Sequence, residues 1–184
     1  MTPLTTERLI LRNWQERDRD LFHLINSDDR VMEFFTMRRS RAEADELMDL
    51  LEAGIATNGF GFAAIEIAGT GETAGFAGLH RTSKVPGVPD GTLEIGWRLA
   101  PAFWGKGFAT EAARRWCEFG FGDLGLDRII SFAVAGNRRS TAVMRRIGMT
   151  ARPDLDFDHP NVPATHPQLQ QHVMYDMLSG DPRG

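Results

Sequence analysis

Hydrophobic residues follow two periods along this chain, and together they predict a mixture of strands and helices. Segments that alternate, or that are almost continuously apolar, are expected as strands at 7–14, 59–67, 73–81, 92–100, 128–135 and 172–178, with one more after Gly148 and Met149. Segments with apolar residues three and four positions apart are expected as helices at 16–27, 41–58, from 109 onward and at 138–147. This pattern indicates one mixed α/β domain over residues 1–178, with a short tail at 179–184.

Local signals mark several boundaries of these elements. Ser40 and Glu43 have the spacing of a capping box, in which each side chain satisfies a backbone N–H at a helix start, and Gly59 is expected to end that helix. The turn at 69–72 is expected to join strands 59–67 and 73–81 into an antiparallel hairpin. Gly148 is expected as a left-handed cap after the last helix.

Residues 92–113 contain the most informative pattern in the chain. Strand 92–100 places Leu93, Ile95, Trp97 and Leu99 on one face and Thr92, Glu94, Gly96 and Arg98 on the other. A loop with glycines at 105 and 107 then opens directly into an amphipathic helix. Free N–H groups and the positive end of the helix dipole meet at such a turn, so the stretch predicts a phosphate-binding site.

Two nucleotide-binding motifs compete for this loop, and neither matches. A P-loop needs a glycine where Ala100 stands, and Ser or Thr where Gly107 follows the lysine. A dinucleotide fingerprint needs a third glycine, but Thr110 occupies that position. A plain strand-to-helix turn, with its glycines present only for packing, remains the alternative for the bare G-x-G spacing.

The string EIGWRLAPAFWGKGFATEA, together with the earlier TERLILR, extends the comparison beyond a short motif. Residues 104–109 resemble the Q/R-x-x-G-x-G/A loop that binds the acyl-CoA pyrophosphate in the GCN5-related N-acetyltransferases (GNAT). The longer string is similar to the branch typified by the ribosomal-protein acetyltransferases RimJ and RimL. Trp104 departs from the broad pattern, which has Gln or Arg there. The resemblance implies a GNAT fold of mixed α/β type: a mostly antiparallel seven-stranded sheet, about four flanking helices, and splayed strands that form the acetyl-CoA cleft.

By this resemblance, acetyl-CoA is the acetyl donor, and most of its contacts come from main chain. The cofactor-binding positions implied are Trp97, Leu99, Trp104, Gly105, Lys106, Gly107, Phe108, Ala109, Thr110, Asn137 and Ser140. The main chain of the strand would pair with the pantetheine arm, and one of its N–H groups would polarise the thioester carbonyl, which is worth on the order of 3 kcal/mol per donor.

Two catalytic side chains are expected on the same basis. Glu94 resembles the strand acid that serves as general base in several relatives, with a solvent-facing or salt-bridged residue as its alternative. Many relatives protonate the leaving thiolate with a tyrosine that follows the asparagine matched here by Asn137. The single tyrosine of this chain is Tyr175, which lies in the last strand. RimL-like members resemble this chain in having a serine instead, and this resemblance makes Ser140 the candidate acid, with a helix cap as its alternative role. Cys117 is expected to be a buried structural thiol.

The segment 152–170 is expected as a loop that carries three aspartates and two histidines: Asp154, Asp156, Asp158, His159 and His166. Such residues can bind metal, but no tight spacing of ligands supports that here, so a solvated acidic loop without a metal is favoured. The resemblance places this loop on the acceptor side of the cleft, where an aspartate could contact the substrate amine.

Composition limits the classes of partner. The chain has 184 residues and a net charge of −4, which disfavours nucleic acid and anionic membranes and suits a basic or neutral amine. No run of 18 apolar residues occurs, the opening MTPLTTERLI lacks a signal-peptide pattern, and one cysteine allows no intrachain disulfide. These features predict a cytoplasmic protein, either monomer or homodimer.

The function predicted is acetyl transfer from acetyl-CoA to a primary amine, on a protein N-terminus or a small molecule, in a ternary complex. A catalytically silent acyl-CoA sensor of the same fold is the alternative. A nucleotide-binding enzyme is a third class, which would bind ATP or NAD instead.

Overall fold

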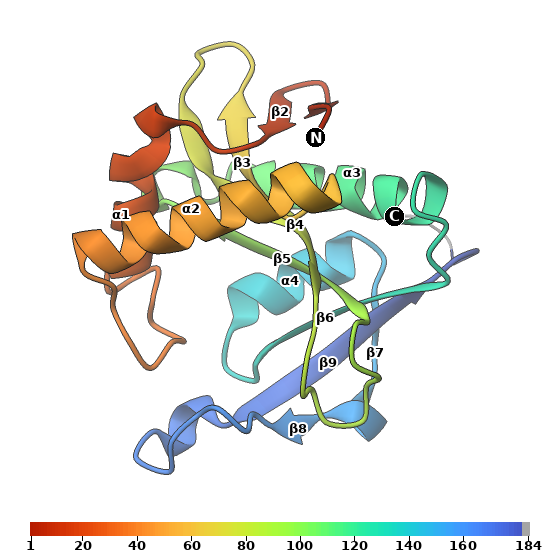
Figure 1. The fold of residues 1–184 in the computed structure, drawn as a ribbon. Helices are drawn as coiled ribbons and strands as arrows, with labels where there is room; N and C mark the ends of the chain where they lie inside the picture. Colours follow the sequence, from red (N-terminus) through yellow and green to blue (C-terminus); the bar gives the residue numbers. More distant parts are fainter. Residues whose placement is uncertain (182–184) are drawn as a thin grey trace. The chain divides into compact units, whose positions relative to one another are not determined.

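Four α-helices and nine strands alternate along residues 1–181, the part of the chain that the computed structural model describes (Figure 1). Their contacts group them into two units. Unit 1 comprises Met1–Leu79 and Gly96–Trp116, and unit 2 comprises His80–Ile95 and the chain from Cys117. Strands β4 and β5 and helix α3 each continue from one unit into the other.

Unit 1 is built on an antiparallel sheet of short strands. In hydrogen-bonded order these are β1 (Leu4–Thr5), β2 (Leu9–Arg12), β3 (Phe62–Ile67) and β4 (Thr73–Arg81). Leu9 and Leu11 of β2 are fully buried, as expected for an alternating strand with one face in the core. Gly75 of β4 allows β5 to approach closely, because a Cβ there would lie 2.2 Å from the carbonyl oxygen of Arg98.

Two helices pack in unit 1. The 3₁₀ turn η1 (Glu16–Asp18) leads into α1 (Arg19–Ser27), and α2 (Arg41–Asn58) packs on α1 and on β3 (Figure 1). Helix α2 begins with the predicted capping box of Ser40 and Glu43. It ends at Gly59, whose φ of +78° is the left-handed conformation that glycine adopts without penalty.

Unit 2 centres on two long antiparallel strands, β6 (Arg128–Val134) and β9 (Gln171–Leu178). The first residues of β5 (Leu93–Leu99) pair in parallel with β6 at a single position, Glu94 opposite Ile130. Two-residue strands β7 (Thr150–Ala151) and β8 (Phe157–Asp158) also pair with β9, and α4 (Arg138–Arg146) packs on β6.

The fold confirms most of the predicted elements. The seven expected strands are all present, the hairpin of β3 and β4 is antiparallel, and Gly148 has a φ of +93°. Two further strands, β1 and β8, were not predicted because each contains only two residues, too few to show a period. The segment 152–170, expected as a loop, also contains β8 and two 3₁₀ turns, η3 (Pro153–Leu155) and η4 (Pro167–Leu169). Of the predicted tail, residues 182–184 lie outside the described chain.

Candidate active site

The loop between β5 and α3 offers a series of unused backbone donors. It follows the 3₁₀ turn η2 (Pro101–Phe103) and opens into α3 (Phe108–Gly122). Gly105 and Gly107 have φ values of +75° and +83°, which a residue with a side chain adopts only with strain. The N–H groups from Gly105 to Thr110 donate to no acceptor within residues 1–181, and the first helical bond runs from Glu111 N to Gly107 O. This is the geometry of an anion site at a helix N-terminus.

Arg8 and Glu111 hold this loop in place. Arg8 Nη1 donates to the Lys106 carbonyl oxygen at 3.1 Å, and Arg8 Nε donates to Glu111 Oε2 at 2.7 Å. The guanidinium also lies 4.9 Å from the ring centre of Phe108. Thr6 Oγ1 donates to the other carboxylate oxygen of Glu111 at 2.5 Å. These contacts attach the N-terminal segment of the chain, through Thr6 and Arg8, to the loop and the first turn of α3.

Sequence reasoning missed Arg8, because about 100 positions separate it from the loop and no spacing rule links them. A signal was nevertheless present. Thr6 and Arg8 both belong to the TERLILR phrase that carried part of the family resemblance. Arg8 is a positioning residue: its charge is paired with Glu111, and it acts on the loop through Lys106 and Phe108.

The second half of β5 leads into the loop. Trp104 Nε1 donates to the Leu99 carbonyl oxygen at 2.8 Å, so the indole fixes the strand end. Leu99 is buried, whereas Trp97 is half-buried. The ammonium of Lys106 lies 5.3 Å from the ring centre of Phe103, beside the glycines. The predicted pairing of Trp97 and Leu99 with a pantetheine arm stays a prediction.

Glu94 stands in unit 2 as a carboxyl group without a partner. It is half-buried, and no residue in 1–181 forms a hydrogen bond or ion pair with it. The salt-bridged alternative is therefore wrong. Desolvation favours the neutral acid and raises the pKa of Glu94 to about 8. A carboxyl with such a pKa can accept a proton near neutral pH, which an ordinary glutamate does poorly.

Asn137 and Ser140 lie at the start of α4. Asn137 is the N-cap, and its Oδ1 accepts from the Ser140 backbone N–H at 3.1 Å. The cap role considered for Ser140 is therefore wrong, because Asn137 performs it. The Ser140 hydroxyl and the Asn137 Nδ2 group form no hydrogen bond within the described chain, so both are available to a ligand.

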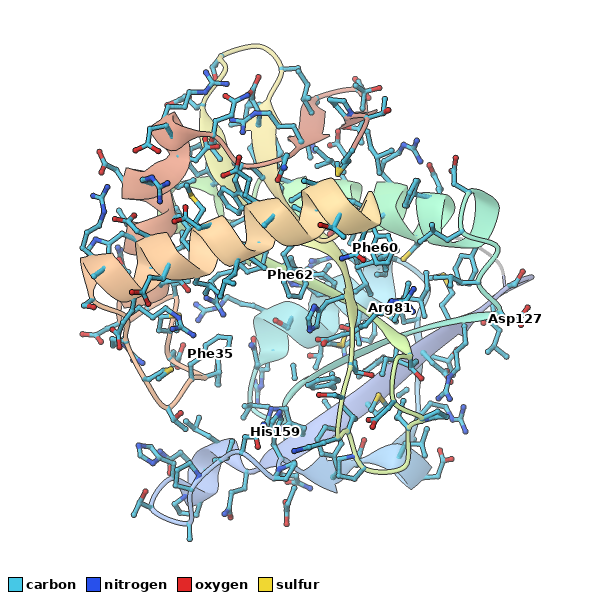
Figure 2. All side chains as sticks on the ribbon, viewed as in Figure 1. Phe35, Phe60, Phe62, Arg81, Asp127 and His159 are labelled. Atoms are coloured by element: carbon cyan, nitrogen blue, oxygen red, sulfur yellow. The ribbon has the colours of Figure 1, made fainter. Side chains whose placement is uncertain are left out.

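Several side chains of the predicted acidic loop form contacts within the protein. Asp154 pairs with Arg152 at 2.9 Å, and Asp156 accepts from the Met174 backbone N–H at 2.8 Å. His159, labelled in Figure 2, lies 4.9 Å from His172 between ring centres. Burial lowers the pKa of both histidines. Within residues 1–181, no cluster of three or more His, Cys, Asp or Glu side chains is arranged to hold a metal ion.

The predicted site residues thus fall into two groups. Unit 1 contains those of the second half of β5 and the loop: Trp97, Leu99, Trp104, Gly105, Lys106, Gly107, Phe108, Ala109 and Thr110. Unit 2 contains Glu94, Asn137 and Ser140. Cys117 is 2% exposed, as expected of a structural thiol.

Comparison with known proteins identifies the family of this chain. Residues 8–150 match the model of the acetyltransferase (GNAT) domain. The uncharacterized N-acetyltransferase p20 of Bacillus licheniformis is 33% identical over 70% of this chain and 71% of its own. A GNAT-family acetyltransferase structure from Bacillus anthracis matches with a TM-score of 0.81, 23% identity, and coverage of 98% of this chain and 100% of that one.

One further solved structure is of interest for its ligands. The spermidine N-acetyltransferase of Vibrio cholerae, in complex with CoA and spermine, matches with a TM-score of 0.72 and 20% identity, over 96% of this chain and 98% of that one. The likeness to these structures establishes the fold: mixed α/β with a mostly antiparallel sheet.

The protein therefore belongs to the GNAT family of acetyltransferases. It is an acyltransferase of the class that uses acetyl-CoA. No helix in residues 1–181 is both long enough and apolar enough to span a bilayer.

Proposed function

We propose that this chain transfers an acetyl group from acetyl-CoA to a primary amine, by direct attack in a ternary complex. The observation that carries the proposal is the series of unused N–H groups from Gly105 to Thr110. A diphosphate supplies the acceptors that those donors lack, and the glycines leave room for it to approach the backbone. Lys106 adds a positive charge beside them.

The donor's thiol arm would meet the second group of residues. Asn137 Nδ2 would donate to the pantetheine, while Asn137 Oδ1 continues to cap α4. Main-chain groups at Trp97 and Leu99 would pair with the arm. An N–H of this strand would stabilise the oxyanion that forms on the thioester carbonyl.

The chemistry needs one base and one acid. Glu94 would take the proton from the acceptor's ammonium group, and the free amine would then attack the carbonyl carbon. When the resulting tetrahedral intermediate collapses, the C–S bond breaks, Ser140 would protonate the departing thiolate, and the serine would regain a proton from the positively charged nitrogen, which becomes the neutral amide. The new amide retains the acetyl group, and CoA leaves as the thiol.

We place the chain in the RimJ/RimL-like branch on the string from Glu94 to Ala112, and we propose a cytoplasmic location on composition and its single buried cysteine. Acceptors within this proposal are protein N-termini and small-molecule amines, without nucleic acid or membrane. The protein would act as a monomer or a homodimer. It would need no metal, because neither proton transfer nor thioester attack requires one.

Purified protein mixed with acetyl-CoA and a broad amine panel tests the proposal. We expect release of the CoA thiol that depends on the amine, with an acetylated product of matching mass. Tight binding of acetyl-CoA without thiol release from any amine would favour the sensor instead. Binding of ATP or NAD, with no heat of binding for CoA, would reject both.

A further inference from the structure

Arg98 occupies an unusual setting in unit 1. Its guanidinium lies between two aromatic rings, 4.3 Å from the centre of Phe35 and 5.3 Å from that of Phe76. Nη1 donates to Asn26 Oδ1 at 2.5 Å. Phe35 belongs to the connection between α1 and α2, where Figure 2 labels it. The two rings and the amide fix the side chain in one orientation.

No carboxylate balances the charge of Arg98. A guanidinium has five N–H donors, and the bond to Asn26 is the only hydrogen bond that Arg98's side chain makes within residues 1–181. Partial burial costs the charged form free energy, so desolvation lowers the pKa of Arg98 to about 10, with a further contribution from the positive charge of Arg39. An uncompensated charge in such a setting is destabilising.

Arg39 is a second cation in the same place. Its backbone N–H donates to the Asn26 carbonyl oxygen at 2.9 Å, so Asn26 holds both arginines. The Arg39 side chain forms no hydrogen bond or ion pair with the described residues, although its charge influences Glu43. Asn26 itself is fully buried, and its Nδ2 donates to the Phe22 carbonyl.

Other arginines of unit 1 show what is missing. Three of them have a carboxylate partner at 2.8 to 2.9 Å: Arg19 with Asp49, Arg38 with Asp29, and Arg41 with Asp45. Arg98 and Arg39 lack one, although acidic residues are abundant in the chain. An anion that is not part of the protein would satisfy both.

CoA does not supply that anion through its thiol arm, because pantetheine is uncharged. Its diphosphate is matched by the N–H groups that begin at Gly105, after β5 has ended. Arg98 precedes that loop and is the neighbour of Trp97, the position expected to pair with the arm. The remaining phosphate of CoA lies on the ribose, at the end of the molecule opposite the thiol, so an anion at Arg98 would come from the second substrate.

We propose that Arg98, together with Arg39, binds a carboxylate of the acceptor, so that the substrates are amines that also carry a carboxylate, such as amino acids and short peptides. This inference rests on the proposed function. A planar guanidinium held by Asn26 matches a carboxylate in two-point geometry. The ring of Phe35, 44% exposed, would contact the apolar part of the same molecule. Polyamines, which carry only positive charge, would be repelled by the two arginines.

The test compares free amino acids with the corresponding amino-acid amides as acceptors, in the wild type and in Arg98→Gln. The measured quantity is the ratio of kcat/KM for acid over amide. The amines of an amino acid and of its amide have different pKa values, but this difference affects the ratio equally in the wild type and in each variant, so it does not affect the comparison between them. We expect Arg98→Gln to lower that ratio by about 10- to 100-fold, mainly through the KM of the acid, because a charge-assisted pair is lost.

Three further variants complete the experiment. Arg39→Gln should lower the ratio in the same direction, and it tests the proposal separately should Arg98→Gln fold poorly. Arg98→Lys, which keeps the charge without the planar fork, should recover part of the ratio. Arg41→Gln removes one positive charge close by in the sequence, from a residue already paired with Asp45, and should leave the ratio unchanged. Thermal melting and CoA affinity verify the fold of each.

An unchanged ratio in both Arg98→Gln and Arg39→Gln would overturn the inference, as would an equal loss of activity with acids and amides. Preference of the wild type for polyamines over amino acids would overturn it too. These outcomes differ from failure of the transferase proposal, in which no amine of either form releases CoA.

Discussion

Glu94 has the environment of a carboxyl group that changes its protonation state during a reaction. It sits on β5 opposite Ile130, and its carboxylate lacks a partner among residues 1–181. A surface glutamate would be ionised at all physiological pH values, whereas desolvation here raises the pKa to about 8. The group can therefore hold a proton taken from an ammonium ion and then release it to water.

Replacing Glu94 by Gln should lower kcat/KM by about 10²- to 10⁴-fold, the usual contribution of a general base. The wild type should become more active as pH rises through about 8, because only the deprotonated carboxyl accepts a proton. The variant should lose that inflection. Steady-state rates between pH 6 and 10 provide the measurement. Glu72→Gln, at an exposed turn, is the control and should behave like the wild type.

The same substitution has a predicted effect on stability. The folded state binds a proton more tightly than the unfolded state does, so Glu94 lowers the free energy of unfolding as pH rises from its unfolded pKa to about 8. Glu94→Gln should therefore raise the melting temperature at pH 8 and change it little at pH 4. A lower melting temperature at pH 8 would contradict this environment for Glu94.

Asn137 and Ser140 should respond differently to truncation. Asn137→Ala removes the cap of α4 and should cost about 0.5 to 2 kcal/mol of stability, together with weaker CoA binding. Ser140→Ala removes a hydroxyl without a protein partner, so the melting temperature should not fall. Its kcat should fall about 10-fold, less than for a typical acid catalyst, because a thiolate leaves readily. Melting curves and kinetics of both variants, measured together, distinguish capping from catalysis.

At the scale of elements, the turn from β5 into α3 has the conformation on which the proposed ligand binding depends. Its glycines adopt positive φ, and its N–H groups have no acceptors in the described chain. Arg8, the residue before β2, holds the turn through a hydrogen bond to the Lys106 carbonyl oxygen. Neither helix α3 nor β5 alone would form the site. The turn combines a helix N-terminus with a backbone path that only small residues follow easily.

Gly107→Ala should weaken CoA binding by at least about 10-fold, because a Cβ would strain the φ of +83° and lie 3.3 Å from Arg8 Nη2. Calorimetry with CoA measures the effect. Gly59→Ala provides a matched control, since its φ is +78° and no atom lies within 4 Å of the added Cβ. The control should lose stability but retain CoA affinity. Equal affinities in all three proteins would show that the turn does not bind the diphosphate.

A buried ion pair links two other elements of unit 1. Arg12 of β2 and Asp18 of η1 meet at 2.7 Å, with residue exposures of 6% and 1%. Burial by itself would raise the pKa of Asp18, but hydrogen bonds from Arg12 and Thr73 outweigh it and lower that pKa below its usual value. The pair therefore stabilises the fold above the unfolded pKa of an aspartate and loses this contribution in acid.

Asp18→Asn should lower the free energy of unfolding by about 1 to 3 kcal/mol at pH 7, because it removes one of the two carboxylates that pair with the buried Arg12, while Glu66 still pairs with it at 2.6 Å. The difference from wild type should narrow as pH falls below 4. Urea unfolding at both pH values measures it. Asp49→Asn, which removes an exposed partner of Arg19, should cost no more than about 1 kcal/mol.

At the scale of the whole molecule, the predicted site residues are divided between the two units. Loop donors come from unit 1, and Glu94, Asn137 and Ser140 come from unit 2. Strand β5 contributes residues to each. A ligand that binds the folded chain and not the unfolded one adds its binding free energy to the stability of the fold.

Acetyl-CoA should therefore raise the melting temperature of the intact chain, with a stabilisation of about 2.7 kcal/mol at a concentration 100 times Kd. The shift should increase with the logarithm of ligand concentration. Scanning calorimetry over a CoA series measures it. Adenosine diphosphate presents a diphosphate without the thiol arm, and it should stabilise far less if contacts at both groups matter.

The features that the sequence predicted correctly are those whose signals are local. The capping box at Ser40, the left-handed Gly59 and the glycine turn at 105–107 each depend on a few adjacent residues, and all three were predicted correctly. Two-residue strands such as β8 were missed because their existence depends on a partner strand rather than on their own pattern. Contacts from Arg8 to Lys106 and from Arg98 to Phe35 were missed for the same reason.

The sequence by itself determined the order of the helices and of seven strands, the glycine turn before α3 and the family, because periodicity, caps and glycine positions act through neighbouring residues. Only the tertiary structure decided which charges are paired. Among residues 1–181 it left Glu94 without a partner, assigned the cap of α4 to Asn137, and placed Arg98 beside two rings with no carboxylate partner. Desolvation and pairing depend on residues far apart in the chain, and no local pattern encodes them.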